Sequence, residues 1–185
     1  MDKNVERIIE KLNAFTMERV IIAIDGRCAS GKTTLAELLK TELDCNVFHM
    51  DDFFLRQEQR TEQRLTEPGG NVDRERFSEE VLAPLLRGED FSYRKYSCRL
   101  GDFSESVNVQ NRRINIIEGA YSCHPDLRNC YDMKIFLSTD YNKQLRRIRA
   151  RNGSSQLFEE KWIPLEEKYF EAFDIPSCCD MLIET

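Results

Sequence analysis

The residue pattern with the clearest chemistry is a glycine-bracketed loop near the start of the chain. Residues 26–33 read Gly-Arg-Cys-Ala-Ser-Gly-Lys-Thr and fit the Walker A pattern G-x-x-x-x-G-K-[ST] at every fixed position. In such a P-loop, backbone N–H groups turn toward bound phosphates, and the following helix adds partial positive charge. Lys32 can reach the β- and γ-phosphates, and the Thr33 hydroxyl can bind Mg²⁺. The predicted nucleotide-binding residues are Gly26, Ala29, Ser30, Gly31, Lys32, Thr33 and Thr34.

Two carboxylate positions follow other expected strands. Asp51, in the run Asp-Asp-Phe-Phe, can accept the proton of an attacking hydroxyl, or it can simply cap a helix. Glu118 can hold Mg²⁺ through water, or it can be a solvated carboxylate at a strand end. Because an open α/β sheet binds its ligands beyond the carboxyl ends of its strands, both are candidate site residues.

Four arginines gather on one expected helix, at positions 146, 147, 149 and 151. A solvated basic face is the simple interpretation. Arg147 and Arg151 are also four residues apart, which places both on one face of the helix.

The elements that must position these residues alternate between strand and helix patterns. A continuous, mostly β-branched run predicts a strand buried on both faces at 20–24, and further strands are predicted at 46–49, 114–117, 133–137 and 181–183. Apolar residues at helical spacing predict helices at the N-terminus, after the P-loop, around 77–86, over 141–151 and over 157–173. The polar stretch at 56–70 is expected to be a loop. Alternating strands and helices imply a parallel α/β sheet with right-handed crossovers.

The predicted fold is therefore a P-loop NTPase fold, in which helices flank a five-stranded parallel sheet. A β-hairpin at about 91–109, outside the main sheet, is predicted from the aromatic and valine residues that flank Gly101 and Asp102. The chain has 185 residues, enough for one domain with a buried core. We expect a single domain over 1–185 with a short lid at about 147–160.

Composition narrows the classes of partner. The formal net charge is −6, whereas nucleic-acid-binding proteins usually carry excess Lys and Arg, so no nucleic-acid partner is expected. No apolar run is long enough to cross a bilayer, and the N-terminus lacks the apolar region of a secretory signal. Seven cysteines without zinc-type spacing are typical of reduced thiols in the cytoplasm. The oligomeric state is left open, with a homo-oligomer among the alternatives.

The motifs together resemble the uridine kinase family, including the related nicotinamide riboside kinases. The resemblance rests on the P-loop, on Asp-Asp-Phe-Phe at 51–54, on Ile-Glu-Gly at 117–119, and on Lys-Ile-Phe-Leu at 134–137 with Thr139-Asp140. Phe158 and Pro164 also match the spacing of a Phe and a Pro in nicotinamide riboside kinases. The similarity runs in order from about residue 20 to residue 183.

The resemblance implies a role for each matched residue. Asp51 would be the general base, and Asp73 would bind sugar hydroxyls, although by pattern alone Asp73 is only a helix N-cap. The hairpin would cover a nucleoside with Tyr93 stacked on the base, although a core position for Tyr93 is an equal alternative. Arg147 and Arg151 would belong to the lid and neutralise the transferred phosphoryl group. Cys98 stands where uridine kinases have a base-reading histidine, so this contact departs from the family pattern.

The expected activity is transfer of phosphate, from ATP or another nucleoside triphosphate with Mg²⁺, to a hydroxyl of a small molecule. A nucleoside is the expected acceptor, and nicotinamide riboside or another metabolite such as pantothenate is the alternative. A nucleotide-binding regulator without catalysis is the competing class. A GTPase switch is excluded, because Asn142-Lys143 is not followed by x-Asp and no aspartate has glycine three residues later.

Overall fold

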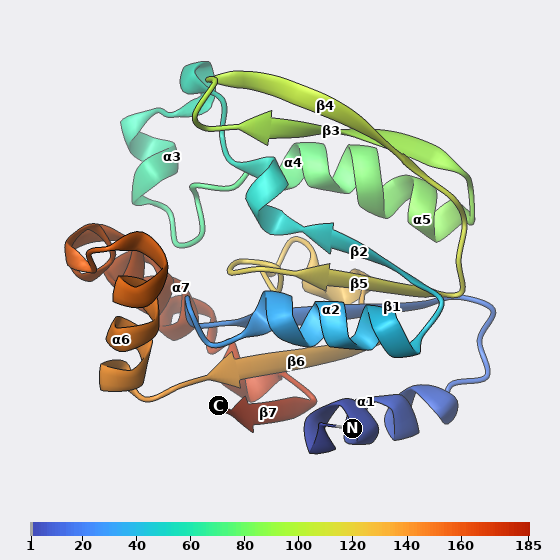
Figure 1. Ribbon diagram of the computed structural model, residues 1–185. Coiled ribbons are helices and arrows are strands. Elements are labelled where there is room, and N and C mark those ends of the chain that lie inside the picture. The colour runs from blue at the N-terminus through green and yellow to red at the C-terminus, as the bar shows by residue number, and fades with distance from the viewer. Residues whose placement is uncertain (1) are drawn as a thin grey trace.

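The computed structural model describes residues 2–185. A run of apolar, mostly β-branched residues forms the central strand of its five-stranded sheet. The strands lie in the order β2-β5-β1-β6-β7 and all run in the same direction. Their carboxyl ends meet at one edge of the sheet, at the left in Figure 1. Their bounds are Val20–Gly26 (β1), Cys45–His49 (β2), Ile114–Glu118 (β5), Met133–Ser138 (β6) and Met181–Glu184 (β7). The predicted five-stranded parallel sheet is confirmed.

Helices pack on both faces of this sheet. Ile22 and Ile24 of β1 point to the face that α1 (Lys3–Asn13) and α2 (Lys32–Glu42) cover. Ile21 and Ala23 point to the opposite face and join a second core with residues of the hairpin and of the later helices. Because successive side chains of a strand alternate between faces, one apolar run supplies both cores.

Two longer helical segments each contain a turn of π-helix. The first comprises α4 (Arg74–Phe77), η3 (Ser78–Leu82) and α5 (Ala83–Arg87). The second comprises η5 (Phe158–Trp162) and α7 (Ile163–Phe173), and it is preceded by α6 (Tyr141–Asn152). No helix within residues 2–185 is both long and apolar enough to span a bilayer.

The segment expected to be a loop at 56–70 contains short helical turns, so that expectation was wrong in part. A 3₁₀ turn, η2 (Gln57–Gln59), precedes the helix α3 (Glu62–Thr66), whose N-cap Thr61 accepts a hydrogen bond from the Arg64 backbone N–H. A helix of five residues is too short to show a repeating apolar stripe. Further 3₁₀ turns are η1 (Met50–Phe53), η4 (Arg128–Cys130) and η6 (Pro176–Cys178).

The predicted β-hairpin is present and lies outside the main sheet. Its antiparallel strands are β3 (Phe91–Ser97) and β4 (Asp102–Val109). Figure 1 shows the hairpin beyond β2, beside α4 and α5. The inner residues Tyr93 and Val109 pack into the core, so the hairpin is fixed to the body of the protein.

Candidate active site

The P-loop connects the end of β1 to α2. Gly26 has φ of +136°, and a Cβ at this position would lie 2.0 Å from the carbonyl oxygen of Leu137, so only glycine fits. Gly31, with φ of +98°, immediately precedes α2. The Lys32 ammonium donates hydrogen bonds to the carbonyls of Gly26 (2.7 Å) and Arg27 (2.9 Å). These bonds hold the curve of the loop with the ammonium group inside it.

A buried carboxylate fixes the position of the first residue of the P-loop. Asp25 accepts hydrogen bonds from the backbone N–H of Gly26 (2.7 Å), the backbone N–H of Cys123 (2.8 Å) and the Tyr169 hydroxyl (2.8 Å). Complete burial raises the pKa of Asp25 above its ordinary value, and these hydrogen bonds partly offset that shift. Asp25 therefore ties β1 to the loop after β5 and to α7.

A cavity of about 720 Å³ opens in front of the P-loop at the carboxyl edge of the sheet. The P-loop residues 28–34 line it together with side chains from η1, β5, α6, η5 and α7. Of the predicted site residues outside the P-loop, Asp51, Glu118, Arg147 and Arg151 line this cavity. The fold thus brings together side chains that lie up to about 120 residues apart in the chain.

Thr33 and Glu118 meet at one wall of this cavity. The Thr33 hydroxyl lies 3.2 and 3.3 Å from the two carboxylate oxygens of Glu118. Nδ1 of His49, at the end of β2, lies 2.5 Å from the same carboxylate, and this hydrogen bond raises the pKa of His49. A hydroxyl beside a carboxylate supplies the oxygen ligands that Mg²⁺ prefers.

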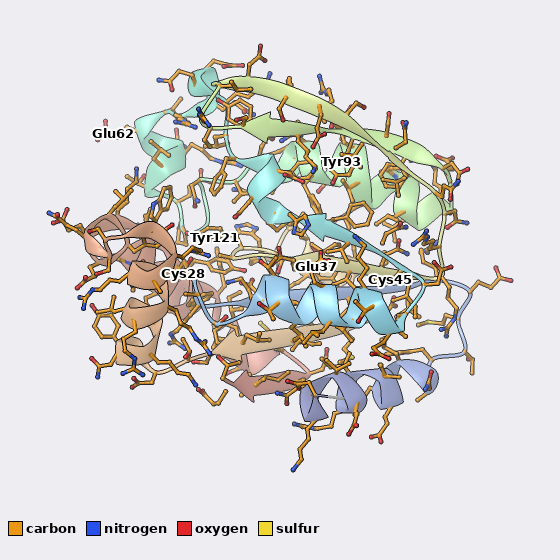
Figure 2. All side chains as sticks on the ribbon, in the orientation of Figure 1. Cys28, Glu37, Cys45, Glu62, Tyr93 and Tyr121 are labelled. Atoms are coloured by element: carbon orange, nitrogen blue, oxygen red, sulfur yellow. The ribbon has the colours of Figure 1, made fainter. Side chains whose placement is uncertain are left out.

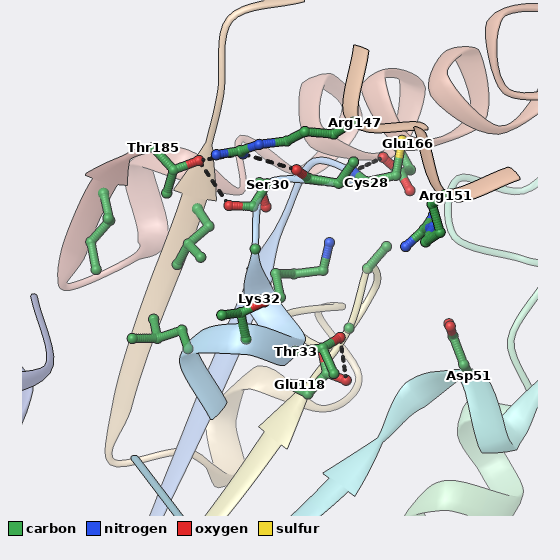
Figure 3. A pocket seen from close by; sticks show the side chains of 18 of the residues that line it. Cys28, Ser30, Lys32, Thr33, Asp51, Glu118, Arg147, Arg151, Glu166 and Thr185 are labelled. Atoms are coloured by element: carbon green, nitrogen blue, oxygen red, sulfur yellow. Dashed lines mark hydrogen bonds between the residues drawn. The ribbon is translucent and has the colours of Figure 1, made fainter. Parts of the chain in front are cut away.

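Asp51 lies across the cavity from the P-loop, in the turn that follows β2 (Figure 3). Its side chain is open to the cavity, yet the protein atoms crowded around it raise its pKa above the ordinary value, and the negative charge of Glu118 raises it further. Lys32, His49 and Arg151 oppose the shift. A carboxylate in this position is suited to accept a proton.

The two arginines of α6 that line the cavity differ in their surroundings. Arg147 donates hydrogen bonds to the carbonyl of Ala29 (3.0 Å) and to the Thr185 hydroxyl (2.9 Å), so it joins the P-loop to the end of β7. The Arg151 guanidinium lies 5.8 Å from the centre of the Phe158 ring and points into the cavity (Figure 3). The expectation that both neutralise a phosphoryl group remains a prediction, and only Arg151 has its guanidinium directed into open space.

The three expected acceptor-binding residues do not line this cavity. Asp73 is buried, caps α4 through the backbone N–H of Arg76 (3.1 Å), and also accepts from Gln59 (2.9 Å). Tyr93 packs in the core between the hairpin and β2, with its ring stacked on Phe53 at 5.5 Å (Figure 2). Cys98 is exposed in the hairpin turn. The two alternative roles inferred from pattern alone are both observed, since Asp73 is an N-cap and Tyr93 is a core aromatic residue. Contacts of Asp73, Tyr93 and Cys98 with an acceptor remain predictions.

One contact at the P-loop had no sequence signal that could reveal it. A carboxylate oxygen of Glu166, in α7, accepts a hydrogen bond of 2.7 Å from the backbone N–H of Cys28. Gln144 of α6 donates to the Cys28 carbonyl (3.0 Å) and to its sulfur (3.2 Å). Burial raises the pKa of the Cys28 thiol to about 12, so the thiol stays protonated and unreactive at neutral pH.

A strand, a P-loop and a helix in sequence, within a parallel sheet whose site lies at the carboxyl edge, define a P-loop nucleotide-binding protein. No protein-family model matches the chain. Mouse nicotinamide riboside kinase 2 is 30% identical over 165 residues, which cover 82% of this chain and 80% of that protein. The chain belongs to the uridine kinase-like family of P-loop kinases.

Solved structures share the fold at low sequence identity. A possible uridine kinase from Bacillus stearothermophilus has a TM-score of 0.72 at 21% identity, covering 97% of this chain and 96% of that one. A proposed fructose transport system kinase from Silicibacter has a TM-score of 0.68 at 22% identity, covering 97% of each chain. With the family relationship, these findings identify the protein as a kinase that transfers phosphate to a hydroxyl group of a small molecule.

Proposed function

We propose that this kinase uses ATP and Mg²⁺ and that its acceptor is a nucleoside, phosphorylated on a sugar hydroxyl. One observation carries the proposal: a P-loop with an inward lysine, a hydroxyl–carboxylate pair and an open carboxylate surround a single cavity. A volume of about 720 Å³ can hold a triphosphate and a small acceptor together.

The donor set at Thr33 and Glu118 fits Mg²⁺. Among residues 2–185 no group of three His, Cys, Asp or Glu side chains could hold a metal. A nucleotide-bound Mg²⁺ needs only one or two protein oxygens, because phosphates and water complete its shell. Thr33 would bind the ion directly and Glu118 through water. When bound, the ion neutralises negative charge on the phosphates.

Asp51 is the residue that would activate the acceptor. The acceptor oxygen forms a bond to the γ-phosphorus while the hydroxyl proton passes to the Asp51 carboxylate. The bond from the γ-phosphorus to the bridging oxygen breaks, and its electron pair leaves with ADP. Lys32 and Arg151 face the region where charge develops, and electrostatic stabilisation there is commonly a large part of catalysis.

Two kinds of nucleoside are alternatives for the acceptor. Uridine or cytidine is expected from the sequence resemblance, but Tyr93 and Cys98, the hairpin residues expected to contact a base, do not line the cavity. Nicotinamide riboside is favoured by the similarity to a nicotinamide riboside kinase over four fifths of the chain. Both are ribosides, so both place a primary sugar hydroxyl where Asp51 can reach it.

A panel of acceptors tests this proposal. ADP formation is measured with ATP and Mg²⁺ in the presence of uridine, cytidine, nicotinamide riboside, pantothenate or a free sugar at equal concentration. We expect stimulation by at least one riboside and none by pantothenate or the sugar. Tight ATP binding without stimulation by any riboside contradicts the proposed acceptor class.

A further inference from the structure

A buried hydroxyl and a buried amide at the cavity have no hydrogen-bond partner in the part of the chain that the structure describes. They are Oη of Tyr121, in the loop after β5, and Nδ2 of Asn71, in the segment before α4. Both residues line the cavity. Leaving a buried donor without a partner costs free energy, and most buried polar groups in folded proteins are paired. A partner for these two groups must therefore come from outside the chain.

Tyr121 is held at the cavity by its backbone and by ring packing. Only 4% of its surface is exposed, and its φ of +75° lies in the left-handed region, which residues other than glycine rarely adopt. Its ring packs edge-on against Tyr169, with 5.0 Å between the ring centres, and the Tyr169 hydroxyl is itself bonded to Asp25 (2.8 Å). Figure 2 shows Tyr121 near Cys28, at the carboxyl edge of the sheet. The position of the Tyr121 side chain is therefore set before a ligand binds.

Asn71 is tied to the turn that carries the proposed general base. The carbonyl of Asn71 accepts a hydrogen bond of 3.2 Å from the Leu55 backbone N–H. Two residues later, the backbone N–H of Asp73 donates to the carbonyl of Phe53 at 2.7 Å. Phe53 belongs to the same 3₁₀ turn as Asp51. Asn71 therefore has a fixed position relative to the Asp51 carboxylate.

The Tyr121 hydroxyl stays protonated at neutral pH. Burial raises its pKa above the ordinary value, and the nearby Glu166 carboxylate raises it further, while the Asn71 amide opposes the shift. Tyr121 and Asn71 thus each present a hydrogen-bond donor. A sugar hydroxyl has two lone pairs, so its oxygen can accept from both groups at once.

We propose that Tyr121 and Asn71 bind a secondary sugar hydroxyl of the acceptor, one that is not phosphorylated, and so determine which sugars the site accepts. This inference rests on the proposed nucleoside kinase activity and adds two acceptor-contacting residues to it. Asp73, which the family resemblance assigns to sugar hydroxyls, already has both carboxylate oxygens engaged, one by the backbone N–H of Arg76 and one by Gln59.

Deoxy analogues measure this contact. Uridine and nicotinamide riboside are each compared in kcat/KM with their 2′-deoxy and 3′-deoxy counterparts, with ATP and Mg²⁺. We expect the intact protein to disfavour the analogue that lacks the bound hydroxyl by on the order of tenfold. In Tyr121→Phe this discrimination falls to near unity, because kcat/KM drops for the full riboside and changes little for that analogue. Asn71→Leu, which removes the other donor, should reduce the discrimination in the same way.

Tyr131→Phe is the matched control. The Tyr131 hydroxyl is also buried without a partner in residues 2–185, but Tyr131 does not line the cavity as described over those residues. Since neither hydroxyl forms a hydrogen bond in the free protein, both Tyr→Phe variants should keep or raise the Tm measured without ligand. Only Tyr121→Phe should lose the discrimination between sugars. A lower Tm for ligand-free Tyr121→Phe, with the discrimination intact, means that the hydroxyl is structural and overturns the inference.

The remaining outcomes separate this inference from the proposed activity. Equal losses for ribosides and deoxy analogues, or a change confined to the KM for ATP, mean that Tyr121 only shapes the cavity wall. Discrimination that is absent in the intact protein, or that persists in both Tyr121→Phe and Asn71→Leu, means that no sugar hydroxyl binds these groups. Each of these results overturns the inference and leaves the nucleoside kinase proposal intact. Turnover of no riboside removes both.

Discussion

Asp51 and Asp52 are neighbours with the same chemistry and different positions. Asp51 lines the cavity, whereas Asp52 lies beside the Tyr93 hydroxyl (3.3 Å) under the hairpin. If Asp51 accepts the acceptor's proton, Asp51→Asn lowers kcat by on the order of 10²–10⁴. ATP affinity, measured by calorimetry, stays near that of the intact protein. Asp52→Asn keeps most of the activity. Substantial turnover by Asp51→Asn removes the general-base assignment.

The pH dependence of the reaction gives a separate test of Asp51. Only the ionised carboxylate can accept a proton, and the surroundings of Asp51 raise its pKa above the ordinary value. We therefore expect kcat/KM to fall as the pH falls through that raised pKa. In Asp51→Asn the residual rate should lack this acidic limb. A limb that persists unchanged in the variant belongs to another group.

Glu166 should also affect the stability of the fold in a pH-dependent way. Burial raises its pKa from 4.5 to about 7, with Lys32 and the Cys28 N–H opposing the shift and Asp25 adding to it. The folded chain holds this proton more tightly than the unfolded chain, so the associated stability is complete below pH 4.5 and is lost as the pH rises to about 7. The full effect is up to about 3 kcal/mol.

Urea denaturation of Glu166→Gln and of the intact protein at pH 5 and pH 8 measures this effect. Glutamine does not titrate, so the variant gains stability relative to the intact protein as the pH rises. Other buried acids, Asp25 among them, titrate in both proteins and cancel in the difference. A stability difference that is the same at both pH values means that Glu166 titrates as an ordinary exposed carboxylate.

At the scale of elements, two of the four arginines of α6 line the cavity, and one of these two makes contacts that are structural. Arg147 joins the P-loop carbonyl of Ala29 to the C-terminal Thr185, while Arg151 faces the cavity. Arg147→Ala should therefore weaken ATP binding and lower the free energy of unfolding by about 1–3 kcal/mol. Arg151→Ala should lower kcat by on the order of 10²-fold with little effect on stability. Steady-state kinetics and urea denaturation distinguish the two, and matching phenotypes contradict this division of roles.

At the scale of the whole molecule, sequence patterns predict the sheet and the P-loop because their signals are local. The run that forms β1 is continuous and mostly β-branched, β5 and β6 are short and mostly apolar, and the P-loop pattern is contiguous. The contact between Cys28 and Glu166 joins residues 138 positions apart, and no local pattern encodes it. Residue type alone also cannot decide between a substrate contact and an N-cap for Asp73, because both roles need the same carboxylate at the start of a helix.

The residues that line the cavity extend from Asp2 and Asn4 at α1 to Thr185, so a bound nucleotide should stabilise the molecule as a whole. A ligand that binds only the folded state at 100 times its Kd adds about 2.7 kcal/mol to the free energy of unfolding. For a chain of this length that corresponds to a rise in Tm of roughly 5–10 °C.

Lys32→Ala should lose most of the rise with ATP and Mg²⁺, since the Lys32 ammonium of the intact protein lies inside the P-loop. Lys40→Ala, an exposed lysine of the same helix, should keep it. An equal rise in both variants means that the triphosphate binds outside the P-loop, and the assignments of Thr33, Asp51 and Arg151, which depend on its position, fail with it.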